Sequence, residues 1–337
     1  MPLLTLLIPT YNMERYLAEC LDSLLVGDTL MELFEALVII DGATDGSASV
    51  AQRYAKRYPQ TFRVIVKENG NYGSCINRGI AEARGEYIRP LDADDRFDNP
   101  AFAAFLRWLG QTDADMIISD YATWSMTDGQ RHDYRYTLPT SHPLSLIDLC
   151  FSTDPKLMMH ATTYRTSLLR QMAYHQTEGI FYTDQEWIFL PVTQAQRIAH
   201  FAQVLYLYRQ GREGQTIDIN VWVRHAADEV RGLKGMAESY LQQRTGVPAA
   251  ALHFMEHRLL TRLEATYRHI FIRSIDAVPE ELARDLDQFI LQQLPRLYRC
   301  IERQTTYHGL NVIGLWRRWP RLYRLFIMIR RAASRLK

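Results

Sequence analysis

The sequence predicts an α/β fold in which helices cover both faces of a mostly parallel sheet, followed by a helical C-terminal region. Two observations carry this prediction. Short apolar runs alternate with helical patterns through the first 120 residues, and each run contains at most one polar or charged residue, so polar and apolar residues do not alternate within it. Such strands are typical of parallel sheets that are buried on both faces. From Ile219 onward, long helical patterns replace this alternation.

Short apolar runs are the predicted strands of this sheet. They are Leu3–Ile8, Ala36–Ile40, Phe62–Val66, Tyr87–Leu91 and Met116–Ser119. Helical patterns lie between them, over 14–25, 48–58, 75–83 and 101–109. In the first of these helices Leu17, Leu21 and Leu24 recur at helical spacing, which gives the helix one apolar face for packing on the sheet.

The second part of the chain is predicted to be helical. Long helical patterns cover 220–244, 250–274, 280–302 and 310–335. Pro248 and Pro279 stand where the second and third of these patterns begin, and proline suits the first turn of a helix. We therefore predict an α/β domain over 1–217 and a helical region over 218–337.

The composition restricts the class of protein. A net charge of +1 argues against a general nucleic-acid binder. No run of about 18 uninterrupted apolar residues occurs, so no transmembrane helix is expected. The segment MPLLTLLIPTYN lacks the basic region and cleavage site of a signal peptide and fits a first strand better. Four scattered cysteines without metal-binding spacing indicate thiols in a reducing compartment, which favours a cytoplasmic protein.

Polar clusters follow three of the predicted strands. They are PTYN at 9–12, DGATDGS at 41–47 and DADD at 92–95. Ligands of parallel sheets bind beyond the carboxyl ends of the strands, so these clusters predict a ligand site. A single Asp after a strand is usually a helix cap, but three adjacent carboxylates after a buried strand repel one another. A bound cation, or positive groups of a ligand, would remove that repulsion.

Four segments together resemble the family-two glycosyltransferases of the GT-A fold. They are LIPTYNMERYLAECLDSLL, VIIDGATDGS, NGNYGSCINRGIAEARGEYIRPLDADD and YTDQEW. The resemblance covers about residues 3–215, with its elements in the expected order. It implies inverting transfer of a sugar from a nucleotide-activated donor, usually with a divalent metal.

By this resemblance, Asp92 lies near the ribose and the metal, and Asp94 is the principal metal ligand. Mn²⁺ or Mg²⁺ can bridge carboxylate and diphosphate oxygens and stabilise the charge that develops on the leaving group. Asp95 has two interpretations that the sequence leaves open. It either supports the site or caps the helix that follows.

The same resemblance assigns the nucleotide to Asp41, with uracil as the expected base. A carboxylate that accepts an imide N–H rejects bases without that donor. The alternative is a turn-forming Asp before Gly42. Pro9 and Tyr11 belong to the first strand-end loop, where the Tyr11 ring is expected to pack against the base. Many relatives carry a further Asp where this chain has Ile40, so recognition rests on Asp41.

Asn77 matches another nucleotide-binding position of the family, although the Arg that often precedes it is Ile76 here. Two further polar residues have structural interpretations. Asn12 belongs to the first strand-end loop, and an equally good interpretation is that it caps a helix that begins at Glu14. Asp45 is expected to shape its turn and to cap the helix from Ser47.

An inverting transfer needs a base that takes the proton of the acceptor hydroxyl. In FYTDQEW, Asp184 matches the second acidic position of the family's ED motif, while the first position is Thr183. We predict Asp184 as the base, with Glu186 as the second candidate. The alternative is that Thr183 or Asp184 caps a helix over 185–193.

The segment YRQGREGQT stands where relatives often contact the donor diphosphate. Arg209 and Arg212 are expected to pair with phosphate oxygens, and Gly211 and Gly214 would let the loop close. His160 could line the acceptor cleft, but a lone His is more often structural.

The tail 310–337 is basic and amphipathic. It contains eight cationic residues and no Asp or Glu, the cations being Arg317, Arg318, Arg321, Arg324, Arg330, Arg331, Arg335 and Lys337. A basic helix with aromatic residues suits the surface of an anionic membrane leaflet. The alternative is a helix that packs on the catalytic domain or on a partner subunit. An oligomer is therefore possible.

The sequence thus predicts a metal-dependent inverting glycosyltransferase that uses a UDP-sugar. The expected acceptor is a glycan or lipid-linked molecule of bacterial surface polysaccharide, met in the cytoplasm or at the inner face of the membrane, and nucleic acid is not an expected partner. A nucleotidyltransferase is disfavoured because PTYN replaces a glycine-rich, lysine-bearing loop. A non-catalytic nucleotide-sugar-binding scaffold stays open because of Ile40, Ile76 and Thr183.

Overall fold

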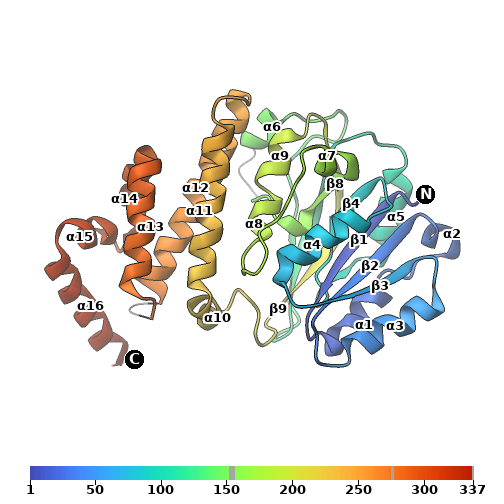
Figure 1. Cartoon of the computed structure of the whole chain (residues 1–337), viewed down its shortest axis with the longest axis horizontal. Helices are drawn as coiled ribbons and strands as arrows, with labels where there is room; N and C mark the ends of the chain where they lie inside the picture. The colour runs from blue at the N-terminus through green and yellow to red at the C-terminus, as the bar shows by residue number, and fades with distance from the viewer. Residues whose placement is uncertain (152–155, 275–276, 336–337) are drawn as a thin grey trace. The chain divides into compact units, whose positions relative to one another are not determined.

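A computed structural model describes residues 1–151, 156–274 and 277–335 of the chain. The chain divides into two compact units, Met1–Gln215 and Thr216–Lys337. Figure 1 shows the sheet in the first unit and the helices of the second. Each unit is described by itself below.

The first unit is built on a sheet that has nine strands among the described residues, in the order β3-β2-β1-β4-β8-β6-β9-β5, with β7 paired to β6. The strands are β1 (Leu4–Thr10), β2 (Phe34–Asp41), β3 (Phe62–Lys67), β4 (Tyr87–Pro90), β5 (Arg96–Phe97), β6 (Met116–Ser125), β7 (Arg131–Tyr134), β8 (Thr162–Arg165) and β9 (Ile198–Gln210). Strands β1 to β4 pair in parallel, as do β6 and β9. Because β8 is antiparallel to both β4 and β6, the carboxyl ends of all six parallel strands meet at one edge.

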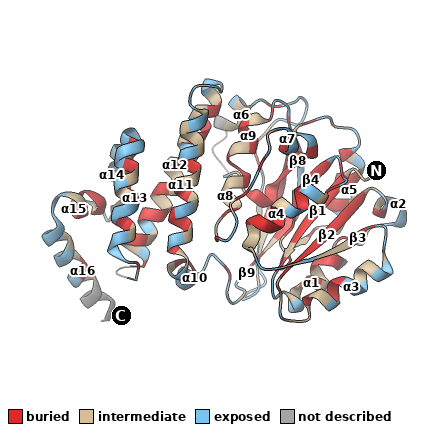
Figure 2. Cartoon of the chain, viewed as in Figure 1, coloured by how far each residue is buried: buried red, intermediate tan, exposed pale blue. Residues whose placement is uncertain are grey.

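Helices connect these strands. They are α1 (Glu14–Asp22), α2 (Asp28–Met31), α3 (Ser47–Arg57), α4 (Asn71–Glu82), α5 (Asn99–Leu109), α6 (Leu146–Phe151), the 3₁₀ helix η1 (Met159–Ala161), α7 (Thr166–Gln171), α8 (Asp184–Trp187) and α9 (Leu190–Gln194). The central strands are buried at nearly every position, so both faces of the sheet are covered (Figure 2). This confirms the predicted α/β class and its mostly parallel sheet.

The run Met116–Ser119 predicted the first part of β6, but β5, β7, β8 and β9 were not predicted by apolar runs. Strand β8 has the sequence TTYR, yet Thr162, Thr163 and Tyr164 are fully buried in the centre of the sheet. Their hydroxyl groups find partners inside the protein, such as Trp187, whose indole N–H donates to Thr162 Oγ1 at 2.9 Å. Polar residues that are satisfied in this way give no hydrophobic signal in the sequence.

The helix expected over 185–193 is wrong as a single element. The structure has two short helices, α8 and α9, with Ile188 and Phe189 between them. Pro191 explains the break, because proline has no amide N–H to donate to the carbonyl of Trp187 and its ring would clash there. That carbonyl instead accepts a hydrogen bond from the Tyr164 hydroxyl at 3.0 Å.

The second unit is helical, with a small pair of strands. Its elements are α10 (Ile219–Arg224), α11 (Ala226–Gln243), α12 (Ala249–Arg268), the π-helix η2 (His269–Arg273), α13 (Glu280–Gln293), α14 (Pro295–Gln304), β10 (Thr306–Tyr307), β11 (Leu310–Asn311), α15 (Val312–Arg318) and α16 (Pro320–Arg335). Each long helix expected from the sequence is therefore subdivided. Pro295 and Pro320 begin new helices, because proline is tolerated in the first turn and not in the interior. No helix in the described ranges is long and apolar enough to cross a membrane.

Candidate active site

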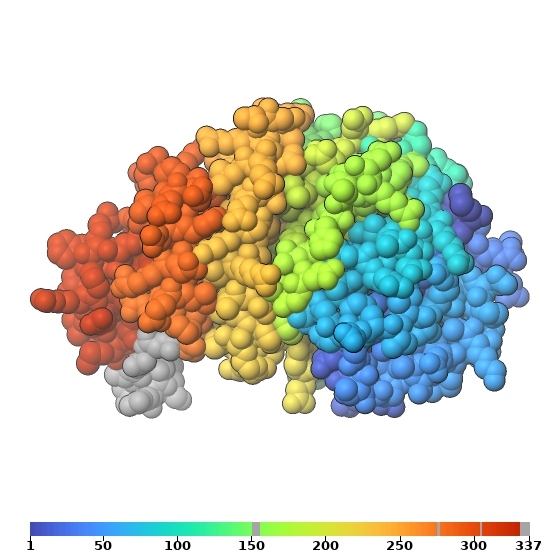
Figure 3. Space-filling model, viewed as in Figure 1, coloured from blue at the N-terminus to red at the C-terminus, as the bar shows by residue number. Residues whose placement is uncertain are grey.

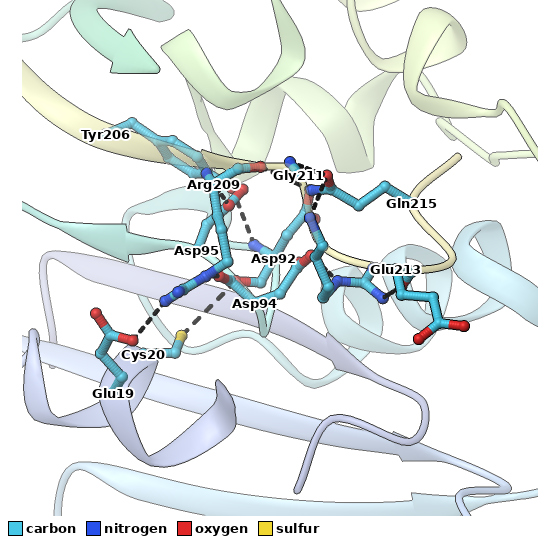
Figure 4. A network of polar contacts seen from close by, with 11 residues as sticks. Glu19, Cys20, Asp92, Asp94, Asp95, Tyr206, Arg209, Gly211, Glu213 and Gln215 are labelled. Carbon is cyan, nitrogen blue, oxygen red and sulfur yellow. Dashed lines mark hydrogen bonds and ion pairs between the residues drawn. The ribbon is translucent and has the colours of Figure 1, made fainter. Parts of the chain in front are cut away.

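The loop after β4 carries three carboxylates at the edge where the parallel strands end (Figure 4). Asp94 and Asp95 are buried and Asp92 is half-buried. Tyr72 on α4 donates a hydrogen bond to Asp92 Oδ1 at 2.9 Å. The Tyr206 hydroxyl on β9 accepts from the Asp92 amide at 3.2 Å and donates to Asp95 Oδ2 at 2.6 Å. Helix α4 and strand β9 therefore both hold this loop in place.

Asp95 supports β9 and does not cap the following helix. Its Oδ1 accepts a hydrogen bond from the backbone amide of Arg209 at 2.7 Å. Helix α5 is instead capped by Asp98, whose carboxylate accepts from the Ala101 amide at 3.1 Å. Of the two interpretations that the sequence left open for Asp95, capping is wrong.

Burial and neighbouring charges raise the pKa values of Asp92 and Asp95. Burial and then the charge of Asp94 raise the pKa of Asp92, and Asp184 adds to the effect. Burial, Asp94 and Asp92 raise the pKa of Asp95 well above its usual range. A positive charge bound here would lower these pKa values, so the donor set fits a hard cation.

The structure does not contain a complete protein metal site in its described residues. No three His, Cys, Asp or Glu side chains of residues 1–151, 156–274 and 277–335 converge on a common point. Asp92 and Asp94 would be the protein's own ligands. Mg²⁺ is commonly held by one or two carboxylates plus substrate phosphates and water, so two carboxylates agree with a metal that arrives with a diphosphate.

The loop after β9 places a guanidinium on Asp94. Arg212 Nε donates to Asp94 Oδ2 at 2.7 Å, and the two groups form an ion pair. Gly211 and Gly214 both have positive φ, which permits the tight turn. Gln215 closes this turn, since its Oε1 accepts from the amides of Gly211 and Arg212 (Figure 4). Sequence reasoning did not identify Gln215.

Arg209 is almost fully buried and is used inside the protein. Its Nε donates to the Asp94 carbonyl at 2.6 Å, and its Nη2 pairs with Glu19 of α1. Its guanidinium carbon lies 4.6 Å from the Trp124 ring centroid and 5.1 Å from that of Tyr16. These contacts fasten the carboxylate loop to α1 and β9. The expected contact of Arg209 with a diphosphate stays a prediction.

Asp41 ends β2 at the same edge of the sheet and is buried. Its Oδ1 accepts from Lys67 Nζ at 2.5 Å and from the Gly70 amide at 3.0 Å. Asn69 Nδ2 donates to the Asp41 carbonyl at 2.9 Å. The carboxylate is thus oriented by the ends of β3 and α4. Lys67 was missed, although it directly follows a predicted strand as the other polar clusters do.

The first strand-end loop is tied to the second. Asn12 Oδ1 accepts from the Thr44 amide at 2.8 Å, so the interpretation of Asn12 as a helix cap is wrong. Asp45 caps instead: one carboxylate oxygen accepts from the Glu14 amide at 2.9 Å, the other from the Ser47 amide at 3.0 Å. Its expected role at Ser47 is confirmed.

Two other residues predicted for the nucleotide lie at or beside this loop. Pro9 lies in β1 opposite Ile39 of β2, one residue before the strand ends. Tyr11 is exposed, so its ring is accessible for the stacking that the sequence predicts. The contacts of Pro9 and Tyr11 with a base stay predictions.

Asn77 joins α4 to the segment 175–178. Its Oδ1 accepts from the Gln176 amide and its Nδ2 donates to the Gln176 carbonyl, both at 2.8 Å. Gly73 brings the same two segments close, because a Cβ at this position would lie 2.0 Å from the Thr177 carbonyl oxygen. The nucleotide contact expected of Asn77 stays a prediction.

Replacing Gly73 by Ala is expected to destabilise the first unit by roughly 1–3 kcal/mol, because backbone must move to admit the methyl group. Thermal unfolding measured by circular dichroism would show a lower midpoint. Gly110→Ala is the matched control, since its helical backbone accepts Ala and the nearest atom is 3.4 Å away. Equal midpoints for the two variants would contradict the close approach.

Asp184 begins α8 and is half-buried. Its Oδ2 accepts from Gln185 Nε2 at 2.7 Å. Its charge contributes to the raised pKa values of Asp92, Tyr72 and Tyr208. The charge of the predicted base therefore acts on Asp92, one of the two predicted metal ligands, which indicates that these two carboxylates lie near each other.

The other residues of the base segment hold it in place. Glu186 Oε2 accepts from the Thr177 amide at 2.8 Å, and burial raises the Glu186 pKa. Thr183 is buried and accepts from Gln176 Nε2 through both its carbonyl and its hydroxyl. Within residues 156–274, Thr183 occupies the N-cap position of α8, but its side chain makes no cap hydrogen bond to the helix, and Asp184 is the first helical residue.

His160 is a buried structural residue. Its ring stacks on Tyr206 and Tyr208, with centroid distances of 4.8 and 5.3 Å. Burial and then the charge of Arg89 lower the pKa of His160 to about 3. Arg89 also donates a hydrogen bond to the His160 carbonyl at 2.5 Å. A neutral imidazole that stacks on two tyrosines of β9 agrees with the interpretation of His160 as a structural residue.

The site has clustered carboxylates at the ends of strands in a mostly parallel sheet. Comparisons with known proteins identify the class of protein to which a chain with this fold and site belongs. Residues 5–175 match the model of glycosyl transferase family 2. This match covers half of the chain, so the chain belongs to that family.

Curated relatives agree with this assignment. The chain is 36% identical over 132 residues to the putative glycosyltransferase EpsH of Bacillus subtilis, covering 39% of this chain and 37% of EpsH. It is 29% identical over 226 residues to the uncharacterized glycosyltransferase EpsJ of the same organism, covering 64% of this chain and 63% of EpsJ. The match to the minor teichoic acid biosynthesis protein GgaB is 30% over 107 residues, 32% of this chain and 12% of GgaB. The chain spans less than two thirds of these relatives.

Solved structures show the same fold. S. aureus TarS 1–349 superposes with a TM-score of 0.70 at 19% identity, over 94% of this chain and 87% of TarS 1–349. The same protein in complex with UDP-GlcNAc gives 0.55 at 19% identity, over 91% and 93% of the two chains. The mannosyltransferase PcManGT from Pyrobaculum calidifontis, in complex with GDP-Man and Mn²⁺, gives 0.54 at 16% identity, over 94% and 88%. These likenesses confirm the GT-A fold expected from the sequence.

Proposed function

We propose that this chain is an inverting glycosyltransferase that moves a sugar from a UDP-sugar to a glycan or lipid-linked acceptor of bacterial surface polysaccharide. The carrying observation is that α4 holds both segments: its Tyr72 donates to Asp92, and its Asn77 binds Gln176 of the segment that precedes Asp184, so a candidate base and a candidate metal ligand are held by the same helix. The name of EpsH supports the activity, the name of GgaB supports the class of product, and the UDP-GlcNAc of TarS supports the class of donor. We place the reaction in the cytoplasm, at the inner face of the membrane.

Each residue has a role in this proposal. Asp92 and Asp94 would hold Mn²⁺ or Mg²⁺, and the bound cation would supply positive charge near the leaving diphosphate. Arg212 contacts the same diphosphate from the loop after β9. Asp41 orients the base of the nucleotide. Asp184 takes the proton of the acceptor hydroxyl in a single displacement, so no covalent enzyme intermediate is needed.

A panel of nucleotide sugars with and without Mn²⁺ would test the proposal. We expect one UDP-sugar to raise the thermal midpoint only when Mn²⁺ is present, because ligand that binds the folded state stabilises it. The same UDP-sugar should be hydrolysed slowly when acceptor is absent. Stabilisation without any hydrolysis or transfer would favour the non-catalytic scaffold, and no stabilisation by any donor would contradict the assignment of the site.

A further inference from the structure

Helix α16 packs on its own unit through one face. The Tyr323 ring meets Phe271 of η2 at 5.8 Å between centroids, and Phe326 meets Tyr307 at 6.0 Å. Ile327 is buried on this face. Arg330 Nη1 donates to the Ile272 carbonyl at 3.0 Å. The helix is thus a fixed part of the helical unit.

A second face of α16 presents apolar side chains to solvent. Its exposed large side chains, together with Trp319 directly before the helix, have exposed fractions between 51% and 65%, and the five residues are Trp319, Leu322, Leu325, Met328 and Ile329. From Leu322 on, their spacing of three and four residues places them along one side of the helix. In the described ranges, thirteen large hydrophobic side chains are exposed, and these eleven positions contain five of them. Figure 3 shows atoms of this part of the chain, coloured red, at the surface. We call these five residues the apolar stripe.

Arginines border the apolar stripe. Arg321 and Arg324 are exposed, and each stands four positions, or about one helical turn, before a residue of the stripe, Leu325 and Met328 respectively. In the part of the chain that the structure describes, no acidic partner is found for Arg321 or Arg324. Arg318, by contrast, is paired with Glu302. The stripe therefore has positive charge beside it that the protein itself does not neutralise.

The charge of this surface selects its occupant. No Asp or Glu follows Glu302 in the sequence. If two copies met through their apolar stripes, Arg321 and Arg324 of each copy would approach the arginines of the other without a carboxylate from this stretch. An anionic bilayer offers both partners, since its acyl region takes the apolar side chains and its headgroups take the arginines.

We propose that α16 lies in the interface of an anionic lipid bilayer, with the apolar stripe inserted and Arg321 and Arg324 at the headgroups. Trp319, which precedes the helix, suits the headgroup level because its ring is apolar and its indole N–H is polar. The inference depends on the proposed function in one respect only, namely that the bilayer surface is the inner leaflet of the membrane. Docking itself does not depend on sugar transfer.

Co-sedimentation of the full-length protein with lipid vesicles tests this inference. We expect binding to vesicles that contain phosphatidylglycerol, little binding to pure phosphatidylcholine, and weaker binding as salt increases. The double variant Arg321→Gln/Arg324→Gln should bind anionic vesicles about 25-fold more weakly, about fivefold for each charge. Leu322→Ser/Leu325→Ser should lower binding by about tenfold or more.

Matched controls come from the same helical unit. Arg296→Gln removes a charge from α14, where the side chain is 76% exposed, and Leu291→Ser removes an exposed Leu from α13. Both controls should bind vesicles as the wild type does. All positions are exposed, and circular dichroism would confirm that each variant is folded.

The remaining outcomes are distinct. Absent binding, or equal binding to neutral and anionic vesicles, would overturn the proposal. So would a concentration-dependent dimer that the leucine variant abolishes, because the stripe would then belong to a second copy. Donor hydrolysis measured on the same proteins separates the two proposals: vesicle binding without any hydrolysis refutes the proposed function and leaves the docking surface in place.

Discussion

Asp184→Asn is expected to stop sugar transfer while donor binding continues. The amide is almost the same size and can still accept the hydrogen bond from Gln185 Nε2, but it cannot take a proton from the acceptor. A positioned base contributes about 10²–10⁴-fold to the rate, so transfer should fall by that factor. The measurement is kcat for transfer together with the Kd for the donor from calorimetry.

Glu186→Gln is the matched control for this experiment. Its retained carbonyl oxygen can still accept from the Thr177 amide, so the segment should keep its position. We expect Glu186→Gln to retain most of the transfer rate. If Asp184→Asn were active and Glu186→Gln were not, the base would be Glu186.

Asp94→Asn is expected to remove the dependence of donor binding on metal. A neutral amide is a weaker ligand than a carboxylate for a hard cation, and the site would keep only Asp92. We expect the Kd for a UDP-sugar in the presence of Mn²⁺ to rise by about 100-fold or more. Calorimetry with and without Mn²⁺ measures this effect.

Asp113→Asn controls for the lost charge, because Asp113 is an exposed carboxylate paired with Arg197 on the surface of the first unit. It should not change the metal dependence. Equal donor affinity for wild type and Asp94→Asn would remove Asp94 from the metal site.

The same substitution has an expected effect on titration. The charge of Asp94 raises the pKa values of Asp92 and Asp95, so removing it should move both toward the ordinary range of a carboxyl group. Carboxyl-selective NMR of the metal-free protein would follow both groups. Unchanged pKa values would contradict a contribution from the charge of Asp94.

The sequence predicted the first half of the sheet because β1 to β4 are short, apolar and separated by helices. It also predicted that polar residues gather where these strands end, as Asp41 and the 92–95 loop do. It failed for β8 and for the broken helix at Pro191. In the first case buried hydroxyl groups hide the strand, and in the second one proline outweighs an otherwise helical pattern.

The partners of the predicted site residues could not be predicted. Tyr72 reaches Asp92 across 20 residues of sequence, while Tyr206 reaches Asp95 across 111. Such pairs depend on which strands become neighbours in the sheet. The order of residues in the sequence does not by itself give the register between distant strands. Lys67, the partner of Asp41, is the exception. It directly follows a predicted strand, so the rule that polar residues follow strands could have identified it.

The hydrogen bonds between Asn77 and Gln176 have a consequence for the order in which parts of the enzyme fold. These residues are 99 positions apart, so their contact closes a long loop and carries the entropy cost of doing so. The carboxylate loop leaves the ribosome well before Asp184 does. The partners that hold this loop, Tyr206 and Arg209 of β9, emerge later still. A growing chain can therefore complete the site only after residues 175–187 have docked on α4 and β9 has followed. Catalytic competence is, on this account, a late event of folding.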